Sequence, residues 1–307
     1  MLINRFQKHF GMICSILMLG GVSYKAHAER PDAPLAHQIE KTVQGQKGLF
    51  AVYAARVGAT PEVCLNCDHL INAASTIKLF VLDAAYKAFA SGTLHPTDLI
   101  RVHNHFHSLV GKGTFALDQK EDSYDFLYAQ QGKEVPVSEL LRVMIQYSSN
   151  LATNLMIEKL GVFPIRDVVK EQALDGIVFG RMIEDFDADA QNIRNRVSAR
   201  GLGEFLQKLD QGQIVGKEAS QSMIAIMLGQ KFNDIIPPGL PAGTPVAHKT
   251  GWVNGVKNDA AIITLPDGAH YILVVLTSGL PDEAAGVKIL NVISREVYDY
   301  FSHSAAH

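Results

Sequence analysis

The order of strand-like and helix-like segments along the chain constrains its fold most. One buried-strand pattern lies near the N-terminus, at 49–55, whereas three others lie near the C-terminus, at 246–251, 260–265 and 271–276. The last two are joined by a loop that begins Pro-Asp-Gly, which favours an antiparallel hairpin. The segment between the two ends is mostly helical in pattern, so we expect the ends of the chain to share one sheet.

The predicted fold class is α/β, with an antiparallel sheet built from both chain ends, flanking helices and an inserted all-helical domain. We expect residues 29–94 and 240–307 to form the sheet domain and residues 95–239 to form the helical domain. A charged segment without clear periodicity, 175–197, is predicted to be a loop. Helices are predicted at 34–44, 75–90, 152–160 and 198–209, with one beginning at Pro136 and a last one opened by Asp282. A cleft between the two domains is the natural place for a site.

The first 28 residues read as a cleavable signal peptide. Arg5 and Lys8 precede an apolar stretch at 10–22, and Ala26-His27-Ala28 has the small residues of a cleavage site. The apolar stretch is too short to cross a bilayer, and the alternative is a retained N-terminal anchor. Export across the inner membrane to the periplasm is the expected localisation. Cleavage removes three basic residues and no acidic one, so the net charge changes from −3 to −6, which gives no electrostatic case for nucleic-acid binding.

The exported chain keeps two cysteines, Cys64 and Cys67, separated by Leu65 and Asn66. An oxidising compartment makes a disulfide plausible. In an extended strand the two Cα atoms would be about 10 Å apart, too far for a disulfide, so the bond requires a turn, and Asn66 suits one. A disulfide, two free thiols and redox chemistry remain open as alternatives.

Three short motifs carry the chemistry. Ser75-Thr76-Ile77-Lys78 places a serine and a lysine on one face at a helix start, where a lysine of lowered pKa can take the proton of the serine. By itself this motif is weak, because a capping serine with a surface lysine has the same pattern. Ser148-Ser149-Asn150 is equally common by chance, whereas Lys249-Thr250-Gly251 is rarer. Their order, spacing and contexts together argue against coincidence.

These motifs resemble those of the penicillin-recognising serine hydrolases, and of class A β-lactamases most closely. The segment 148–155 is similar to their Ser-Asp-Asn segment, including a second asparagine, Asn154, and 195–200 is similar to the end of their Ω-loop. The resemblance covers most of residues 35–300 and implies the β-lactamase/transpeptidase-like fold. It also implies a serine hydrolase that opens β-lactam rings, with no metal or organic cofactor.

The resemblance implies a role for each matching residue. Ser75 is the expected acylated nucleophile and Lys78 its general base, and Ser148 relays a proton to the leaving nitrogen. Asn150 is expected to hold the side-chain amide of the substrate, and Asn154 to anchor the Ω-loop. The residues expected to bind the substrate carboxylate are Lys249 and Thr250, and the backbone N–H groups of Ser75 and Trp252 form the expected oxyanion hole.

The deacylating base is where the chain departs most from the family. Class A enzymes have Arg-x-Glu with an asparagine four residues later, whereas here Glu184 follows Arg181 one place late and Ala188 stands four places beyond it. We expect Glu184, rather than Asp185, to activate the water, because its longer side chain reaches across a displaced loop. Exposed loop acids without a catalytic role are the alternative. Ser149 replaces the family aspartate, and the arginine after Lys-Thr-Gly is absent, with Lys257 the nearest basic residue.

Further features of the chain leave their interpretation open. His103, His105 and His107 alternate and could hold zinc on a strand, but a surface loop is the better interpretation. His248 is expected to point away from the cleft, and Trp252 to line the pocket or to lie in the core. Two rival functions remain beside β-lactam hydrolysis and antibiotic resistance: a D-alanyl-D-alanine peptidase or transpeptidase, and a penicillin-binding sensor that acylates without turnover. A monomer is expected.

Overall fold

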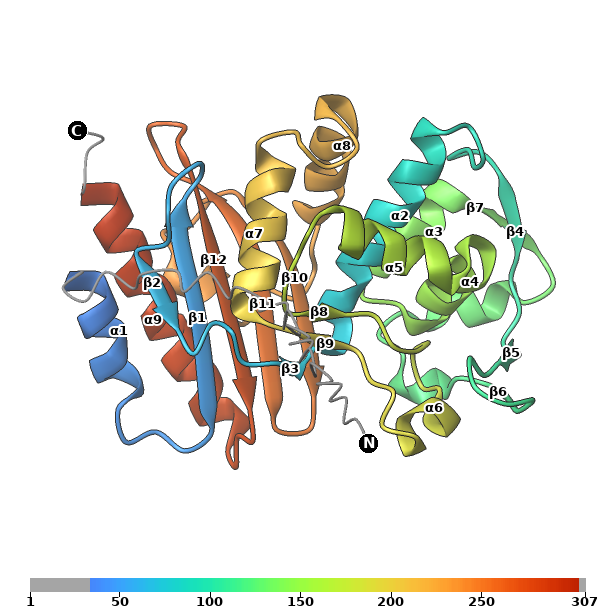
Figure 1. The fold of residues 1–307 in the computed structure, drawn as a ribbon, viewed down its shortest axis with the longest axis horizontal. Coiled ribbons are helices and arrows are strands. Elements are labelled where there is room, and N and C mark those ends of the chain that lie inside the picture. Colours follow the sequence, from blue (N-terminus) through green and yellow to red (C-terminus); the bar gives the residue numbers. More distant parts are fainter. Residues whose placement is uncertain (1–33, 304–307) are drawn as a thin grey trace, which may run out of the picture. The chain divides into compact units, whose positions relative to one another are not determined.

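A five-stranded antiparallel sheet joins the two ends of the chain in the computed structural model, which describes residues 34–303 (Figure 1). Its strands, in spatial order, are β10 (Val246–Val253), β11 (Val256–Thr264), β12 (His270–Ser278), β1 (Leu49–Arg56) and β2 (Val63–Leu65). The register pairs Leu49 with Ser278 and Arg56 with Tyr271. The N-terminal strand therefore lies beside the last C-terminal strand, as the sequence predicts.

Some of the helices lie against this sheet, and the others form the region built from the middle of the chain (Figure 1). They are α1 (Pro34–Val43), α2 (Lys78–Ala90), α3 (Val137–Gln146), α4 (Asn150–Leu160), α5 (Val162–Glu171), α6 (Phe186–Ala190), α7 (Ala199–Asp210), α8 (Lys217–Met227) and α9 (Glu283–His303). The 3₁₀ helices are η1 (Ala74–Ile77), η2 (Gln119–Glu121), η3 (Asp125–Gln130) and η4 (Pro237–Gly239). None of the helices within 34–303 is both long and apolar enough to span a bilayer.

Short strand pairs tie the helical region together. The strands β3 (Ile71–Asn72), β9 (Arg196–Val197) and β8 (Ile177–Val178) form one small sheet. Two further pairs are β4 (Leu99–Arg101) with β7 (Glu134–Pro136), and β5 (Phe106–His107) with β6 (Thr114–Phe115). The segment 175–197, predicted to be a loop without regular structure, thus contains α6 and parts of the small sheet. These elements are too short to show a periodicity of their own, and pairing with β3 stabilises β9.

Both faces of the large sheet are buried, which explains why its inner strands β1 and β12 are almost entirely apolar. Alternate residues of β1 enter two different cores: Phe50 and Val52 pack with α1 and α9, whereas Ala51 and Tyr53 belong to the core shared with the helical region. Helix α7 packs on β1 through Gly203, where a Cβ would lie only 2.4 Å from the Tyr53 ring. Glycine at this position therefore sets how closely the helix approaches the sheet.

The sequence predictions for most elements are confirmed, with boundaries that shift by a few residues. Helices α5 and α8 have no individual counterpart among the predicted helices. The described residues belong to one compact unit, so the domain boundaries at 94/95 and 239/240 stay predictions. The signal peptide predicted for residues 1–28 lies outside the described residues.

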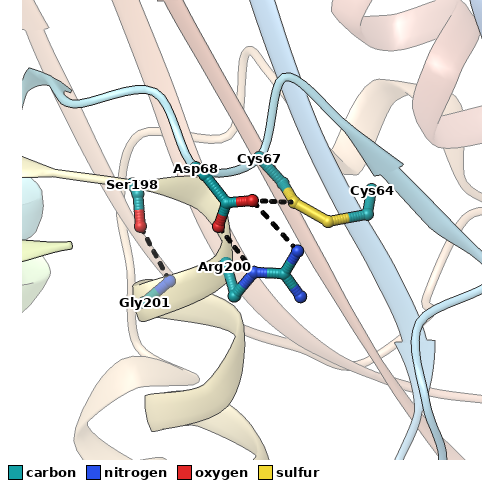
Figure 2. Close-up of a disulfide and its surroundings, with 6 residues drawn as sticks. All are labelled: Cys64, Cys67, Asp68, Ser198, Arg200 and Gly201. Atoms are coloured by element: carbon teal, nitrogen blue, oxygen red, sulfur yellow. Dashed lines mark hydrogen bonds and ion pairs between the residues drawn. A yellow bond between two sulfur atoms is a disulfide. The ribbon is translucent and has the colours of Figure 1, made fainter. Parts of the chain in front are cut away.

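Cys64 and Cys67 form a disulfide, which decides between the possibilities that the sequence leaves open (Figure 2). Asn66 adopts a positive φ of 48°, and the resulting turn brings the two Cα atoms to 5.1 Å. The Cys67 carbonyl then accepts a hydrogen bond from Arg200 N at 2.9 Å, and Asp68 pairs with the Arg200 guanidinium. The disulfide turn, which precedes Ser75 by a few residues, is therefore joined to the start of α7.

Asp83, on α2, is buried, and neither of its carboxylate oxygens has a hydrogen-bond partner within the described residues. Burial raises the pKa of its carboxyl to about 7, from about 4 in an unfolded chain. The folded protein therefore binds more protons than the unfolded chain between these values. Each pH unit in this window lowers the free energy of unfolding by up to about 1.4 kcal/mol.

We predict that Asp83→Asn removes this contribution. Its stability should fall less than that of the wild type between pH 4 and 7, and its melting temperature above pH 7 should be higher by several degrees. Calorimetry across this pH range measures both quantities, with the exposed Asp125→Asn as the matched control. An unchanged pH dependence in Asp83→Asn would show that Asp83 ionises normally.

Candidate active site

Three segments that are distant in sequence meet at one cleft. The turn η1 and the start of α2 carry Ser75 and Lys78, the loop before α4 carries Ser148, and strand β10 carries Lys249. The cleft has a volume of about 680 Å³, and its walls include Ser75, Asn150, Glu184 and Trp252. The topology explains the convergence, because β10 packs directly on η1 while α4 contacts α2.

Ser75 lies in η1, immediately before α2, where it is partly exposed at the cleft. The preceding residue, Ala74, has a positive φ of 44°, and its N–H donates to Asn72 Oδ1 at 2.9 Å. Asn258, buried on β11, donates to the Asn72 carbonyl at 2.9 Å and accepts from Thr277 N on β12. The segment that leads to Ser75 is thus held by the large sheet.

The glycine of the third motif allows β10 to touch this turn. A Cβ at Gly251 would lie 2.8 Å from Ser75 N and 2.9 Å from Thr76 N, which is closer than real Cβ atoms approach. Only glycine therefore lets the strand pass the backbone of the Ser75 turn at this distance. The next residue, Trp252, lines the same cleft.

Lys78 and Lys249 are fully buried, and both donate to the same oxygen, Ser148 Oγ, at 3.2 and 3.0 Å. Lys78 also donates to the Ser148 carbonyl at 2.6 Å and to Asn150 Oδ1 at 2.9 Å. Ser148 has a positive φ of 57°, which turns both its carbonyl and its hydroxyl toward the lysines. One hydroxyl thus bridges two amines.

Burial determines the protonation of this pair. Desolvation lowers the pKa of Lys78 to about 7, although Asp122 and Glu184 oppose the shift. Desolvation, followed by repulsion from Lys78, also lowers the pKa of Lys249 well below its ordinary value, and Asp259 opposes this. A neutral amine is therefore present near neutral pH, and a neutral amine can accept a proton.

Asn150 connects the lysine pair to Glu184. Its Oδ1 accepts from Lys78, and its Nδ2 donates to Glu184 Oε1 at 3.2 Å. The other carboxylate oxygen of Glu184 accepts from Asp118 N at 3.1 Å. Burial is the main cause that raises the pKa of Glu184 above its usual range. The acid predicted from sequence therefore lies in the cleft, and a hydrogen bond from the loop at residue 118 holds it there.

Asp185 has a different environment from its neighbour. Its carboxylate is completely buried and accepts from Ser108 Oγ at 2.7 Å, Leu109 N at 2.9 Å and Ala188 N at 3.1 Å. It thereby caps α6 and ties the segment 175–197 to the loop near residue 108. Glu184, with a positive φ of 59°, faces the cleft instead.

Two asparagines hold the Ω-loop-like segment, 175–197: Asn154 from α4, and Asn195 from within the segment. Asn154 on α4 exchanges two hydrogen bonds with the backbone of Ile183, both at 2.9 Å. Asn195 accepts from Gly180 N and Arg181 N, and donates to the Arg181 carbonyl at 3.0 Å. The two hydrogen bonds between the Asn154 side chain and the Ile183 backbone are the kind of contact by which a residue anchors a loop.

Strand β10 brings two further residues of interest, Trp252 at the cleft and the buried Thr250 two places before it. Trp252 is 37% exposed and packs edge-on against Phe232, so it lies at the cleft rather than in the core. Thr250 Oγ1 is buried without a hydrogen-bond partner in the described part of the chain, so it is available to a ligand. Lys257 pairs with Glu283 at 2.9 Å and is therefore already neutralised by a residue at the cleft mouth.

The histidines singled out from sequence lie elsewhere. His103 pairs with Glu158 at 2.8 Å, and the rings of His105 and His107 are 6.2 Å apart. Within 34–303, the donor atoms of three potential metal ligands come together only at Cys64, Cys67 and Asp68, where both cysteines are in the disulfide. His248 is buried and contacts Asp259 and Asn233, both at 3.0 Å, away from the lysine pair.

Sequence reasoning missed three residues that shape the site: Asp118, Asp122 and Asn258. Each is a single polar residue outside the three motifs, so no local pattern distinguishes it. Their importance comes only from contacts across the fold, namely Asp118 N to Glu184, Asp122 to the start of α4, and Asn258 to the Ser75 turn.

We predict that Gly251→Ala leaves the fold intact but displaces the Ser75 turn, since the new Cβ meets backbone atoms that cannot rotate away. Reaction of Ser75 with a fluorescent penicillin should slow by about 100-fold, as a displacement of the reacting groups by an ångström commonly does. Gly45→Ala, just after α1, is the control for a strained glycine replacement away from the Ser75 turn: its φ of +77° disfavours alanine, but its Cβ meets no atom within 4 Å. If Gly251→Ala reacts with the penicillin at the normal rate, the Ser75 turn accommodates the added Cβ and the prediction is wrong.

Comparison with known proteins agrees with this geometry. The sequence profile of the beta-lactamase enzyme family matches residues 34–301. The chain is 27% identical over 274 residues to the extended-spectrum beta-lactamase PER-1 of Pseudomonas aeruginosa, covering 85% of this chain and 84% of that protein. It is 24% identical to a beta-lactamase of Bacillus amyloliquefaciens, covering 80% of this chain and 76% of that one.

Solved structures show the same fold. The acyl-enzyme complex of the PBP-A L158E mutant with penicillin G superimposes with a TM-score of 0.74 at 25% identity, covering 89% of this chain and 98% of that one. The TLA-3 extended-spectrum beta-lactamase gives a TM-score of 0.73 at 20% identity, covering 87% and 98%. With the profile match across nearly all described residues and the three motifs assembled at one cleft, the chain belongs to the beta-lactamase enzyme family.

Proposed function

We propose that this protein is a serine hydrolase that opens the β-lactam ring through an acyl-enzyme on Ser75. The observation that carries the proposal is the pair of buried lysines around Ser148 Oγ, joined through Asn150 to a cleft that is also lined by Ser75. This arrangement supplies a neutral amine as base and a relay hydroxyl without any metal. The relatives named as beta-lactamases support the same reaction.

In the acylation step, neutral Lys78 takes the proton of Ser75, and the serine oxygen attacks the lactam carbonyl. The N–H groups of Ser75 and Trp252 stabilise the oxyanion. Cleavage of the C–N bond requires a proton on the leaving nitrogen. Ser148 donates it and is reprotonated from the lysine pair, whose hydrogen bonds to its hydroxyl support this relay. The substrate carboxylate is bound by Lys249 and by the Thr250 hydroxyl, which has no hydrogen-bond partner among residues 34–303.

In the deacylation step, a base must activate water on the face opposite to the leaving group. Glu184 suits this role because it lies in the cleft with one carboxylate oxygen on Asn150. Asp185 is unsuitable, since all its contacts are structural and it is buried away from the cleft. Ala188 stands where the family has an asparagine four residues after the glutamate. The hydrogen bond from Asp118 N holds Glu184 instead.

A slower penicillin-binding hydrolase is the second candidate. It is favoured by the absence of the family asparagine at Ala188 and by the similarity of the fold to PBP-A. Such a protein would form the same acyl-enzyme but release it poorly. A D-alanyl-D-alanine peptidase of the same fold would instead cleave peptides.

A turnover assay separates these functions. Purified protein is mixed with a chromogenic cephalosporin, and separately with a D-alanyl-D-alanine peptide, while mass spectrometry follows the adduct on Ser75. Sustained hydrolysis of the cephalosporin supports the β-lactamase. One stoichiometric burst with a lasting adduct supports the slow penicillin-binding hydrolase, and peptide release supports the peptidase. No adduct on Ser75 and no hydrolysis would refute the proposed mechanism.

We also propose export to the periplasm, where a β-lactamase protects the cell-wall enzymes and confers resistance. The signal-like residues 1–28 motivate this localisation, and the Cys64–Cys67 disulfide suits an oxidising compartment. A monomeric state stays a prediction.

Glu184→Gln should acylate at Ser75 normally but accumulate the acyl-enzyme, because an amide cannot take the proton of the attacking water. Deacylation is expected to slow by a factor of about 100 to 10,000. Stopped-flow kinetics and intact mass measure the two steps separately. Asp185→Asn is the comparison: it should lower stability by loosening α6, without a lasting adduct. Accumulation in Asp185→Asn alone would reverse the assignment.

Acylation should depend on pH through Lys78. The neutral amine is the active form, so the acylation rate should rise with pH through a midpoint near 7 and fall about tenfold per pH unit well below it. Lys78→Met should abolish this dependence and nearly all acylation. Lys87→Met, nine residues further along the same helix, is the control. A midpoint near 10 in the wild type would mean that Lys78 keeps its ordinary pKa.

A further inference from the structure

The second motif of this chain lacks the carboxylate that its family relatives carry at the middle position, because Ser149 stands there. Ser149 nevertheless caps α4, with Oγ accepting from Ala152 N at 3.2 Å. A carboxylate is present at the same helix end, but it comes from Asp122, a residue distant in sequence in the turn that follows η2.

Asp122 is buried, with only 8% of its surface exposed, and each of its carboxylate oxygens accepts hydrogen bonds. Oδ2 accepts from Leu151 N at 2.8 Å, from Tyr128 Oη at 3.1 Å and from Ser149 Oγ at 3.4 Å. Oδ1 accepts from Tyr124 N at 3.1 Å. The carboxylate therefore joins the first turn of α4 to the segment 122–128, which includes the start of η3.

The two residues that flank Ser149 are those with roles in the site. Ser148, with its positive φ, supplies the hydroxyl between the lysines, and Asn150 contacts both Lys78 and Glu184. The bonds from Leu151 N and Ser149 Oγ to Asp122 lie immediately next to them. A helix N-terminus also favours a negative charge, so the carboxylate suits this position.

Asp122 also acts on the charges of the cleft. Its carboxylate favours the protonated form of Lys78 and opposes the lowering of its pKa by burial, and it contributes to the raised pKa of Glu184. The other charged groups that face this cluster are Glu184, Asp118 and Lys249, and the neutral phenol of Tyr128 lies beside Asp122. Loss of the Asp122 charge would therefore lower the pKa of Lys78.

We propose that Asp122 is a positioning residue that supplies, from a neighbouring loop, the carboxylate that the second motif lacks at Ser149. It orients Ser148 and Asn150 for acylation and maintains the charge balance around Lys78. The inference rests on the proposed function, since the acylation of Ser75 is the step that it assists. It differs from a purely structural role because it predicts that the carboxylate can be moved to position 149.

The test compares Asp122→Asn with the double variant Asp122→Asn/Ser149→Asp. Ser149 Oγ is 3.4 Å from Asp122 Oδ2, so an aspartate at 149 places a carboxylate close to the original one. Asp122→Asn should acylate more slowly by about 10- to 100-fold, mainly in the rate constant rather than in KM. Its pH midpoint for acylation should move to lower pH, because Lys78 loses a stabilising negative charge.

The double variant should recover most of the acylation rate and return the midpoint toward that of the wild type. Ser149→Asp alone should be less stable than the wild type, because two carboxylates then share one helix end. Asp125→Asn, exposed and three residues away at the start of η3, is the control for removal of one negative charge. Pre-steady-state acylation by a chromogenic cephalosporin from pH 5 to 9, with melting temperatures, measures all of these effects.

The outcomes are decisive in either direction. Recovery in the double variant supports the proposal, even if Asp122→Asn alone does not fold. An unchanged rate and midpoint in Asp122→Asn, or a double variant that gains nothing in rate or folding, overturns it. A wild type that forms no adduct on Ser75 would instead refute the proposed function, so the two failures are distinguishable.

Discussion

The burial of two lysine amines around one serine hydroxyl is the constraint on which the rest of the site depends. Taking an ammonium group out of water is costly, so the folded protein lowers the pKa of Lys78 and Lys249 and surrounds them with acceptors. The same burial that destabilises the charged form creates a proton acceptor near neutral pH. The polar partners Ser148 and Asn150 are consequently fixed by hydrogen bonds on every side.

The sheet that is built from both ends of the chain determines where the lysines lie. Strand β10 brings Lys249 to the cleft, and the absence of a side chain at Gly251 lets it touch the Ser75 turn. Asn258 on the neighbouring strand holds the backbone that precedes this turn. A change in strand register by one residue would turn Lys249 to the other face, so the pairing of β10 with β11 is part of the catalytic geometry.

Two adjacent acids of the Ω-loop-like segment, Glu184 and Asp185, have different roles, and this difference is the feature of the segment that most affects function. Asp185 is used for capping and for contact with the loop near Ser108, which leaves Glu184 to face the cleft. Asn154 holds the backbone of Ile183, and the hydrogen bond from Asp118 N holds Glu184 where Ala188 stands in place of the family asparagine. The displaced acid therefore keeps a place beside Asn150 despite the altered local sequence.

The sequence by itself determined the sheet from both chain ends and the three motifs, because apolar strand runs and short motifs are local patterns. It left open whether Cys64 and Cys67 pair, and the turn at Asn66 decided this. It favoured Glu184 over Asp185 through side-chain length alone. Only the tertiary structure gave the two acids different surroundings and brought Asp122 to the start of α4. Contacts between distant segments leave no periodic trace in the sequence, and these contacts complete the site.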